Sequence, residues 1–136
     1  MTRISAPVVF ASDIHPDNGL ALEKIFKANP LLSETAGVTV KDFFALQPSD
    51  IKIPAERRQN ALITLNPPYG LRLGSKGAAV QLIADIGRKL KKDFSGWRVA
   101  LIVSDSHLIT HIPFPLTAHR LFHGGLTVTL LTGRIR

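Results

Sequence analysis

The stretch that decides the fold is ALITLNPPYG, residues 61–70. Residues 61–65 form a short apolar run of the kind that makes a buried strand. Asparagine, two prolines and tyrosine follow at the carboxyl end of that strand. Because ligands of open α/β sheets bind outside the carboxyl ends of the strands, residues 66–69 stand where a binding site would lie.

Apolar runs on either side of this stretch predict an alternation of strands and helices. We expect strands over residues 7–11, 38–40, 61–65 and 97–103. We expect helices over 16–28 and 78–92, with one more short turn of helix over 31–36. Loops are expected over 47–60 and 71–76, and irregular or briefly helical chain over 104–115. Gly124-Gly125, between the runs 119–122 and 126–132, predicts a tight hairpin.

This order predicts an α/β fold with a mostly parallel, doubly wound sheet that ends in an antiparallel hairpin. Gly19 weakens the prediction for the helix over 16–28, since glycine is a poor helix former. The helix over 78–92 is better supported, because it carries an apolar side and basic residues in its last turns, where cations suit the helix dipole.

The amino-acid composition limits the classes of protein to which this chain can belong. The net charge is +7 and the isoelectric point about 10.3, which favours polyanionic partners, although many small basic domains bind no nucleic acid. The chain has no cysteine, which excludes disulfides and thiolate metal sites. No apolar run approaches the roughly 20 residues of a membrane span, and the N-terminus does not resemble a signal peptide. We expect a cytoplasmic protein.

The histidines do not predict a metal site. His107 and His111 are four residues apart, as are His119 and His123, and zinc sites use such pairs on helices. Nearby prolines and the strand-like second pair argue against helices, and no third ligand suggests itself. The order Ser-Asp-Ser-His at 104–107 contains the residue types of a catalytic triad, but neighbours in sequence do not form one.

The tetrad at 66–69 resembles the Asn-Pro-Pro-Tyr motif of S-adenosylmethionine-dependent methyltransferases that modify planar amino groups. The resemblance extends, in order and spacing, to one subfamily, the bacterial 23S ribosomal RNA guanine-N2 methyltransferases. These are relatives of the tRNA guanine-N2 enzymes that carry a THUMP domain. The further matching stretches cover nearly the whole chain and read SDI at 12–14, GLRL at 70–73, FSGWR at 94–98 and LFHGGL at 121–126.

This resemblance implies a Rossmann-like class I methyltransferase fold that lacks its first strand and glycine-rich loop. In the family that loop holds the methionine part of the cofactor, but only twelve residues precede Asp13 and they contain no Gly-x-Gly-x-Gly. We therefore expect residues 1–136 to be a partial methyltransferase domain, the C-terminal part of the catalytic domain. The missing strand would lie between the strands over 8–11 and 61–65, which would leave two exposed edges and permit a homodimer or other association.

The tetrad suits methyl transfer to an exocyclic amine, whose nitrogen becomes positive as it attacks. Asn66 Oδ1 and the Pro67 carbonyl can accept from its hydrogens and stabilise that charge. Pro67 and Pro68 stiffen the loop, since each fixes φ near about −65°. Tyr69 offers a flat face on which a flipped base can stack. The alternative is that the tetrad is only a turn after a strand.

The resemblance also implies a set of cofactor residues. Asp13, with Ile14 beside it, would bind the ribose hydroxyls of S-adenosylmethionine. Asp42 would accept from the adenine amino group, and Phe43 would lie beside the ring. Each acid could instead be a helix cap or a solvated turn carboxylate. Arg72 could contact a substrate phosphate or be a surface charge.

The most specific function that the resemblance implies is methylation of guanine N2 in 23S ribosomal RNA. Adenine-N6 DNA methyltransferases and release-factor glutamine methyltransferases resemble the chain at the tetrad and remain alternatives. A non-catalytic RNA-binding or assembly module is the alternative from another class. Without the glycine-rich loop, we expect the chain alone to bind the cofactor weakly and to be inactive.

Overall fold

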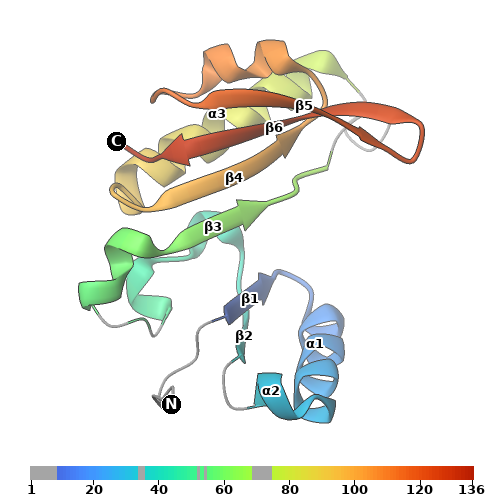
Figure 1. Cartoon of the computed structure of the whole chain (residues 1–136), viewed down its shortest axis with the longest axis vertical. Helices are drawn as coiled ribbons and strands as arrows, with labels where there is room; N and C mark the ends of the chain where they lie inside the picture. The colour runs from blue at the N-terminus through green and yellow to red at the C-terminus, as the bar shows by residue number, and fades with distance from the viewer. Residues whose placement is uncertain (1–8, 34–35, 52, 54, 69–74) are drawn as a thin grey trace. The chain divides into compact units, whose positions relative to one another are not determined.

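A computed structural model describes residues 9–33, 36–51, 53, 55–68 and 75–136 (Figure 1). The chain divides into two compact units, Met1–Ala55 and Glu56–Arg136. Each unit contains its own sheet, so each is described by itself. No helix of the described residues is long and apolar enough to cross a membrane.

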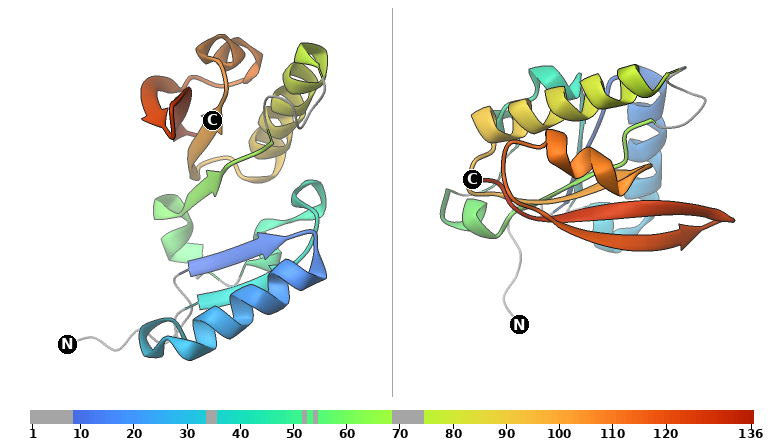
Figure 2. Two further views of the ribbon diagram at one scale, coloured as in Figure 1. Left: turned by 90° about the vertical axis from the view of Figure 1, so that its right-hand side faces the viewer. Right: turned by 90° about the horizontal axis from the view of Figure 1, so that it is seen from above.

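The first unit is a strand–helix–strand arrangement. Strand β1 pairs in parallel with β2, in a register that runs from Val9 opposite Ala36 to Asp13 opposite Val40. The left view of Figure 2 shows α1 running alongside these two strands. Two 3-10 turns follow β2. The elements are β1 (Val9–Asp13), α1 (Pro16–Ala28), α2 (Pro30–Ser33), β2 (Ala36–Val40), η1 (Phe43–Ala45) and η2 (Pro48–Asp50).

Helix α1 has the bounds that the sequence predicts, and its glycine has a packing reason. Pro16 opens the helix at a position where its missing N–H costs nothing. Gly19 is buried against β2, and a Cβ there would lie 2.5 Å from Cγ2 of Val40. Only glycine allows the helix to approach the sheet this closely. The residue that lowers helix propensity is therefore the one that lets α1 pack against β2.

The second unit is a four-stranded sheet in the order β3-β4-β6-β5. Strands β3 and β4 are parallel, whereas β6 runs antiparallel to both β4 and β5 and lies between them. Its elements are η3 (Ala55–Asn60), β3 (Leu62–Leu65), α3 (Lys76–Asp93), β4 (Arg98–Val103), η5 (Ser106–His111), β5 (Thr117–His123) and β6 (Leu126–Arg134), and η3 begins one residue before the unit.

The predicted tight hairpin is confirmed between β5 and β6. Gly124 and Gly125 both have positive φ, 55° and 80°, as a two-residue turn of type I′ requires. The chain after β6 stays within the sheet's core, because Ile135 is fully buried and exchanges backbone hydrogen bonds with Gly96 and Trp97. Residues close to the C-terminus therefore complete the middle of this unit.

The core of the second unit lies on one face of its sheet. Helix α3 and η5 cover that face, as the right view of Figure 2 shows. Ser75 caps α3 by accepting from the N–H of Ala78 at 3.1 Å. Phe94 and Trp97 meet edge to face, with ring centroids 5.2 Å apart. The fully buried side chains are those of Leu90, Phe94, Val99, Leu101, Val103, Leu131 and Ile135.

Several predicted bounds are wrong in detail. The short helix is Pro30–Ser33 rather than 31–36, because Ala36 and Gly37 extend along β1 as part of β2. Residues 47–60, expected as loop, contain two 3-10 turns that satisfy backbone groups locally. Helix α3 begins at Lys76, since Ser75 supplies its cap. The first strand extends to Asp13, while residues 7, 8 and 71–74 lie outside the described residues.

Strands β1 and β3 belong to different sheets. Within the described ranges, β1 pairs only with β2 and β3 only with β4. Among the described residues, each of these two strands is paired with another strand along one edge only.

Candidate functional site

The candidate catalytic tetrad begins where β3 ends. Leu65 is the last residue of β3 and pairs with Leu101 of β4. Asn66 follows with an exposed side chain that makes no hydrogen bond to the described part of the chain. The exposed amide offers an acceptor oxygen and an NH₂ donor at this strand end.

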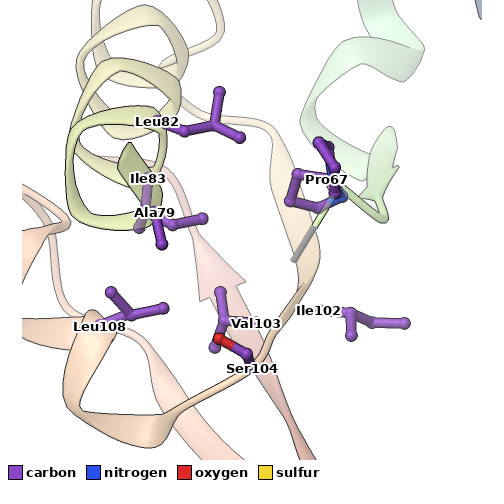
Figure 3. Close-up of a pocket in the computed structure, with 9 residues that line it drawn as sticks. Pro67, Ala79, Leu82, Ile83, Ile102, Val103, Ser104 and Leu108 are labelled. Atoms are coloured by element: carbon purple, nitrogen blue, oxygen red, sulfur yellow. The ribbon is translucent and has the colours of Figure 1, made fainter. Parts of the chain in front are cut away.

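An apolar pocket lies beside the two prolines (Figure 3). Side chains of α3 form one wall, and the end of β4 and the start of η5 form another. The cavity volume is about 10 Å³, enough for about one water molecule. The lining is Pro67, Pro68, Ala79, Leu82, Ile83, Ile102, Val103, Ser104 and Leu108. The described residues therefore support the two prolines with an apolar wall but do not hold a nucleobase in this pocket.

Ser104 is the pocket residue that the sequence analysis missed as a site candidate. It is the first residue after β4, as Asn66 is the first residue after β3, and the two strands are parallel. Its placement at a strand's carboxyl end, the same signal that marks the tetrad, predicts a site residue at this position. The next residue, Asp105, caps η5 by accepting from the N–H of His107 at 2.9 Å.

Asp13 lies at the carboxyl end of β1. Its Oδ1 accepts from the N–H of His15 at 2.8 Å, and its Oδ2 accepts from Nδ2 of Asn18 at 3.2 Å. These bonds favour the charged form, the one from His15 most, so the pKa of Asp13 lies below its ordinary value of 3.8. A carboxylate has about four acceptor positions, and a third, weaker bond from the N–H of Ile14 still leaves one for another donor. Asp13 thus orders the start of α1 and keeps capacity for a ligand.

Asp42 lies at the same edge of the first unit's sheet. The N–H of Lys41 donates to the carbonyl of Asp13 at 2.9 Å, which brings the ends of the two strands together. Asp42 is exposed and caps η1 by accepting from the N–H of Phe44 at 3.0 Å. Phe43 is half-buried and meets Phe44 edge to face. The structure therefore brings the two carboxylates to one sheet edge, where Asp42 also acts as a cap and Asp13 accepts from the N–H of His15, the N-cap residue of α1.

The candidate residues fall into two groups by unit. Asp13, Ile14, Asp42 and Phe43 belong to the first unit, and Ile14 is exposed there. Asn66, Pro67 and Pro68 belong to the second. Tyr69 and Arg72, the expected substrate contacts, lie outside the described residues.

The histidines of the described residues do not gather into a metal site. Among the residues searched, no group of three or more His, Cys, Asp or Glu side chains could hold a metal ion. His107 and His111 lie on η5, whereas His119 lies on β5 and contacts the hydroxyl of Thr132 at 3.1 Å. The polar groups at the strand ends are acceptors, suited to binding hydroxyl and amino hydrogens.

The strand order and the polar residues at the strand ends define a class I methyltransferase fold. The crystal structure of the SMU.472 methyltransferase complexed with SAH superposes with a TM-score of 0.73 at 18% identity. It covers 94% of this chain, which in turn covers 32% of that one. A methylase from Clostridium difficile 630 gives 0.75 at 19% identity, with 98% and 33% covered.

The chain belongs to the family described as the RMKL-like methyltransferase domain, which matches residues 32–114. It is 38% identical over 96 residues to the ribosomal RNA large subunit methyltransferase K/L of Shewanella sp. (strain ANA-3), covering 69% of this chain and 13% of the relative. It is 34% identical over 119 residues to the protein of the same name from Shewanella frigidimarina, covering 86% and 15%. The chain thus spans about a seventh of these relatives.

Proposed function

We propose that this chain is part of an S-adenosylmethionine-dependent methyltransferase that modifies guanine N2 in 23S ribosomal RNA. Family membership and the names of the Shewanella relatives support methylation of ribosomal RNA. The observation that carries the proposal is the exposed amide of Asn66 at the carboxyl end of β3, in a chain of this family. Because the relatives are several times longer, the activity belongs to a larger protein.

In the proposed reaction, S-adenosylmethionine supplies an electrophilic methyl group bound to a positive sulfur. The chain's part is to hold the attacking amine. Oδ1 of Asn66 and the carbonyl of Pro67 accept from the two hydrogens of the exocyclic nitrogen as it becomes positive. Pro67 and Pro68 offer no competing N–H donor and hold these acceptors in place. No general base is needed before transfer, because the amine is already neutral.

The base and the cofactor would contact different residues. Tyr69 would stack on the flipped guanine, and Arg72 would contact a phosphate beside it. Asp13 would accept from the ribose hydroxyls of the cofactor, with Ile14 beside it. Asp42 would accept from the adenine amino group, and Phe43 would pack on the ring. The acceptor position that Asp13 retains and the exposure of Asp42 fit these donors.

The proposal extends to two properties of the protein. We propose that it works in the cytoplasm, where ribosomal RNA is modified. We also propose that the isolated chain associates with copies of itself through the unpaired edges of β1 and β3, because unpaired edges recruit further strands.

The decisive experiment places this chain in a complete enzyme. We suggest a chimera in which residues 1–136 replace the matching segment of the Shewanella relative, incubated with labelled S-adenosylmethionine and undermethylated 23S RNA. The expected product is N2-methylguanosine, identified by mass spectrometry of the nucleosides. N6-methyladenosine would contradict the proposed base. A folded chimera that binds RNA but transfers no methyl group would favour the non-catalytic module.

The same chimera tests Asn66. Asn66→Ala removes one acceptor of the transition state, so turnover should fall by about 100-fold, as for the loss of one oxyanion-hole donor. Asn60→Ala is the matched control, because Asn60 is an exposed asparagine in η3, just before β3. Equal turnover in the two variants would show that Asn66 has a structural role only.

A further inference from the structure

We propose that the tip of the β5–β6 hairpin, defined by Arg120, Leu121, Phe122 and Leu126, is a contact surface for single-stranded RNA. The inference rests on the proposed function, since it concerns how the RNA substrate is held. It adds a second contact, on an element that carries none of the candidate catalytic or cofactor residues.

The hairpin tip exposes an unusual amount of apolar surface. The ring of Phe122 is 82% exposed, and Leu121 and Leu126 are 41% and 59% exposed. Strand β6 pairs with β4 only from Thr129 onward, so residues 126–128 extend beyond the sheet's ladder with β4. Figure 1 shows the hairpin reaching past the end of β4. The hairpin thus holds a flat ring away from the core, where folding gains little from it.

A cation accompanies this ring. Arg120 and Phe122 are two residues apart on β5, so their side chains project from the same face, about 7 Å apart along the strand. Arg120 is exposed and makes no ion pair or side-chain hydrogen bond with the described residues. A ring on which a base can stack and an exposed cation for its phosphate are the two parts of a sequence-tolerant single-strand contact.

The charge around the hairpin favours a nucleic acid over a second copy of the chain. Residues 106–136 contain three arginines and neither aspartate nor glutamate. In a symmetric dimer through the tip, each Arg120 would meet an equally acid-free surface and no counter-charge. RNA brings one negative charge with every nucleotide and an aromatic base for the ring.

The experiment measures binding of a fluorescein-labelled 12-nucleotide oligouridine to the intact chain by fluorescence anisotropy. Phe122→Ala should weaken binding about tenfold, within the range of one lost base stack, while Phe122→Tyr should keep it. Arg120→Gln should weaken binding and reduce the slope of log K against log salt by about 0.7, the value for one phosphate of a single strand. Ile25→Ala, an equally apolar exposed side chain on α1, is the control and should bind as the parent chain does.

The outcomes separate this inference from the proposed function. If the parent chain binds RNA and Phe122→Ala binds equally well, the hairpin contact is refuted while an RNA substrate stands. If Phe122→Ala changes the mass measured by light scattering, the tip is an interface between copies and the inference is also refuted. If the parent chain binds no oligonucleotide, the inference fails, and methylation by the chimera decides the proposed function separately.

Discussion

Gly87 lies where α3 approaches η5, and its replacement by alanine tests how closely they pack. A Cβ at this position would lie 2.7 Å from Cδ of Pro113, 3.2 Å from Cδ1 of Ile112 and 3.4 Å from its Cα. Real Cβ atoms essentially never come within 3.0 Å of another heavy atom, and a proline ring cannot rotate away. The substitution therefore forces α3 and the chain after η5 apart.

The expected magnitude combines two opposing effects. Overpacking of a core costs about 1–3 kcal/mol, whereas glycine to alanine within a helix gains about 1 kcal/mol of helix propensity. Because the clash involves a ring and backbone, we expect the upper half of the cost, and Gly87→Ala should lower the free energy of unfolding by about 1–2 kcal/mol. Gly77→Ala is the matched control in the same helix, since its Cβ would come no closer than 4.0 Å to another group of the described residues.

Urea unfolding of the second unit provides the assay. Trp97 is the chain's single tryptophan and is 5% exposed, so its fluorescence reports on this unit's core. Gly77→Ala should raise the free energy of unfolding by about 0.5–1 kcal/mol while Gly87→Ala lowers it. If both substitutions stabilise the chain, then α3 and the segment after η5 do not pack as described.

Three further predictions follow from features of the first unit and the sheet edges. The isolated chain should bind S-adenosylmethionine with a dissociation constant above roughly 1 mM, a binding free energy weaker than about −4 kcal/mol. Micromolar binding by calorimetry would contradict the expectation that the family's glycine-rich loop is required for tight binding. The folded-state pKa of Asp13 is lowered, so its contribution to stability is present above its ordinary pKa of 3.8 and is lost as the pH falls through the folded value. Circular dichroism melts between about pH 5 and about pH 3 should therefore show a smaller loss of stability for Asp13→Asn than for the parent chain, and equal losses would refute this. Light scattering at micromolar concentration should show association through the edges of β1 and β3, and a monodisperse monomer would rule it out.

The sequence predicts those parts of the fold that depend on local chemistry. The bounds of α1 follow from Pro16 at its start and Asn29-Pro30 at its end, and the hairpin follows from two consecutive glycines. Helix propensity alone treats Gly19 as a weakness of α1. The reason for a glycine there is the side chain of Val40, which is twenty-one residues away in the sequence. Contacts of this kind belong to the packed structure and leave no periodic signal.

Some features of the candidate site could likewise be predicted from the sequence, and others could not. Placement of Asn66, Asp13 and Asp42 at strand ends follows from reading apolar runs and what comes after them. Asp42 caps the turn after its strand, which the sequence offered only as an alternative to binding, whereas Asp13 accepts from the N–H of His15 and from Asn18. The apolar wall beside Pro67 and Pro68 could not be predicted, because it requires the register of α3 against β4.

The central position of β6 has a consequence for how the second unit is made. Protein synthesis proceeds from the N-terminus, so β3, α3 and β4 leave the ribosome before their sheet can form. Val103 of β4 can pair with Thr129 of β6 only after the hairpin has been translated. Trp97 can form its backbone hydrogen bond with Ile135 later still. Until then the edge of β4 opposite β3 has no antiparallel neighbour. The complete sheet therefore forms only once these last residues have left the ribosome.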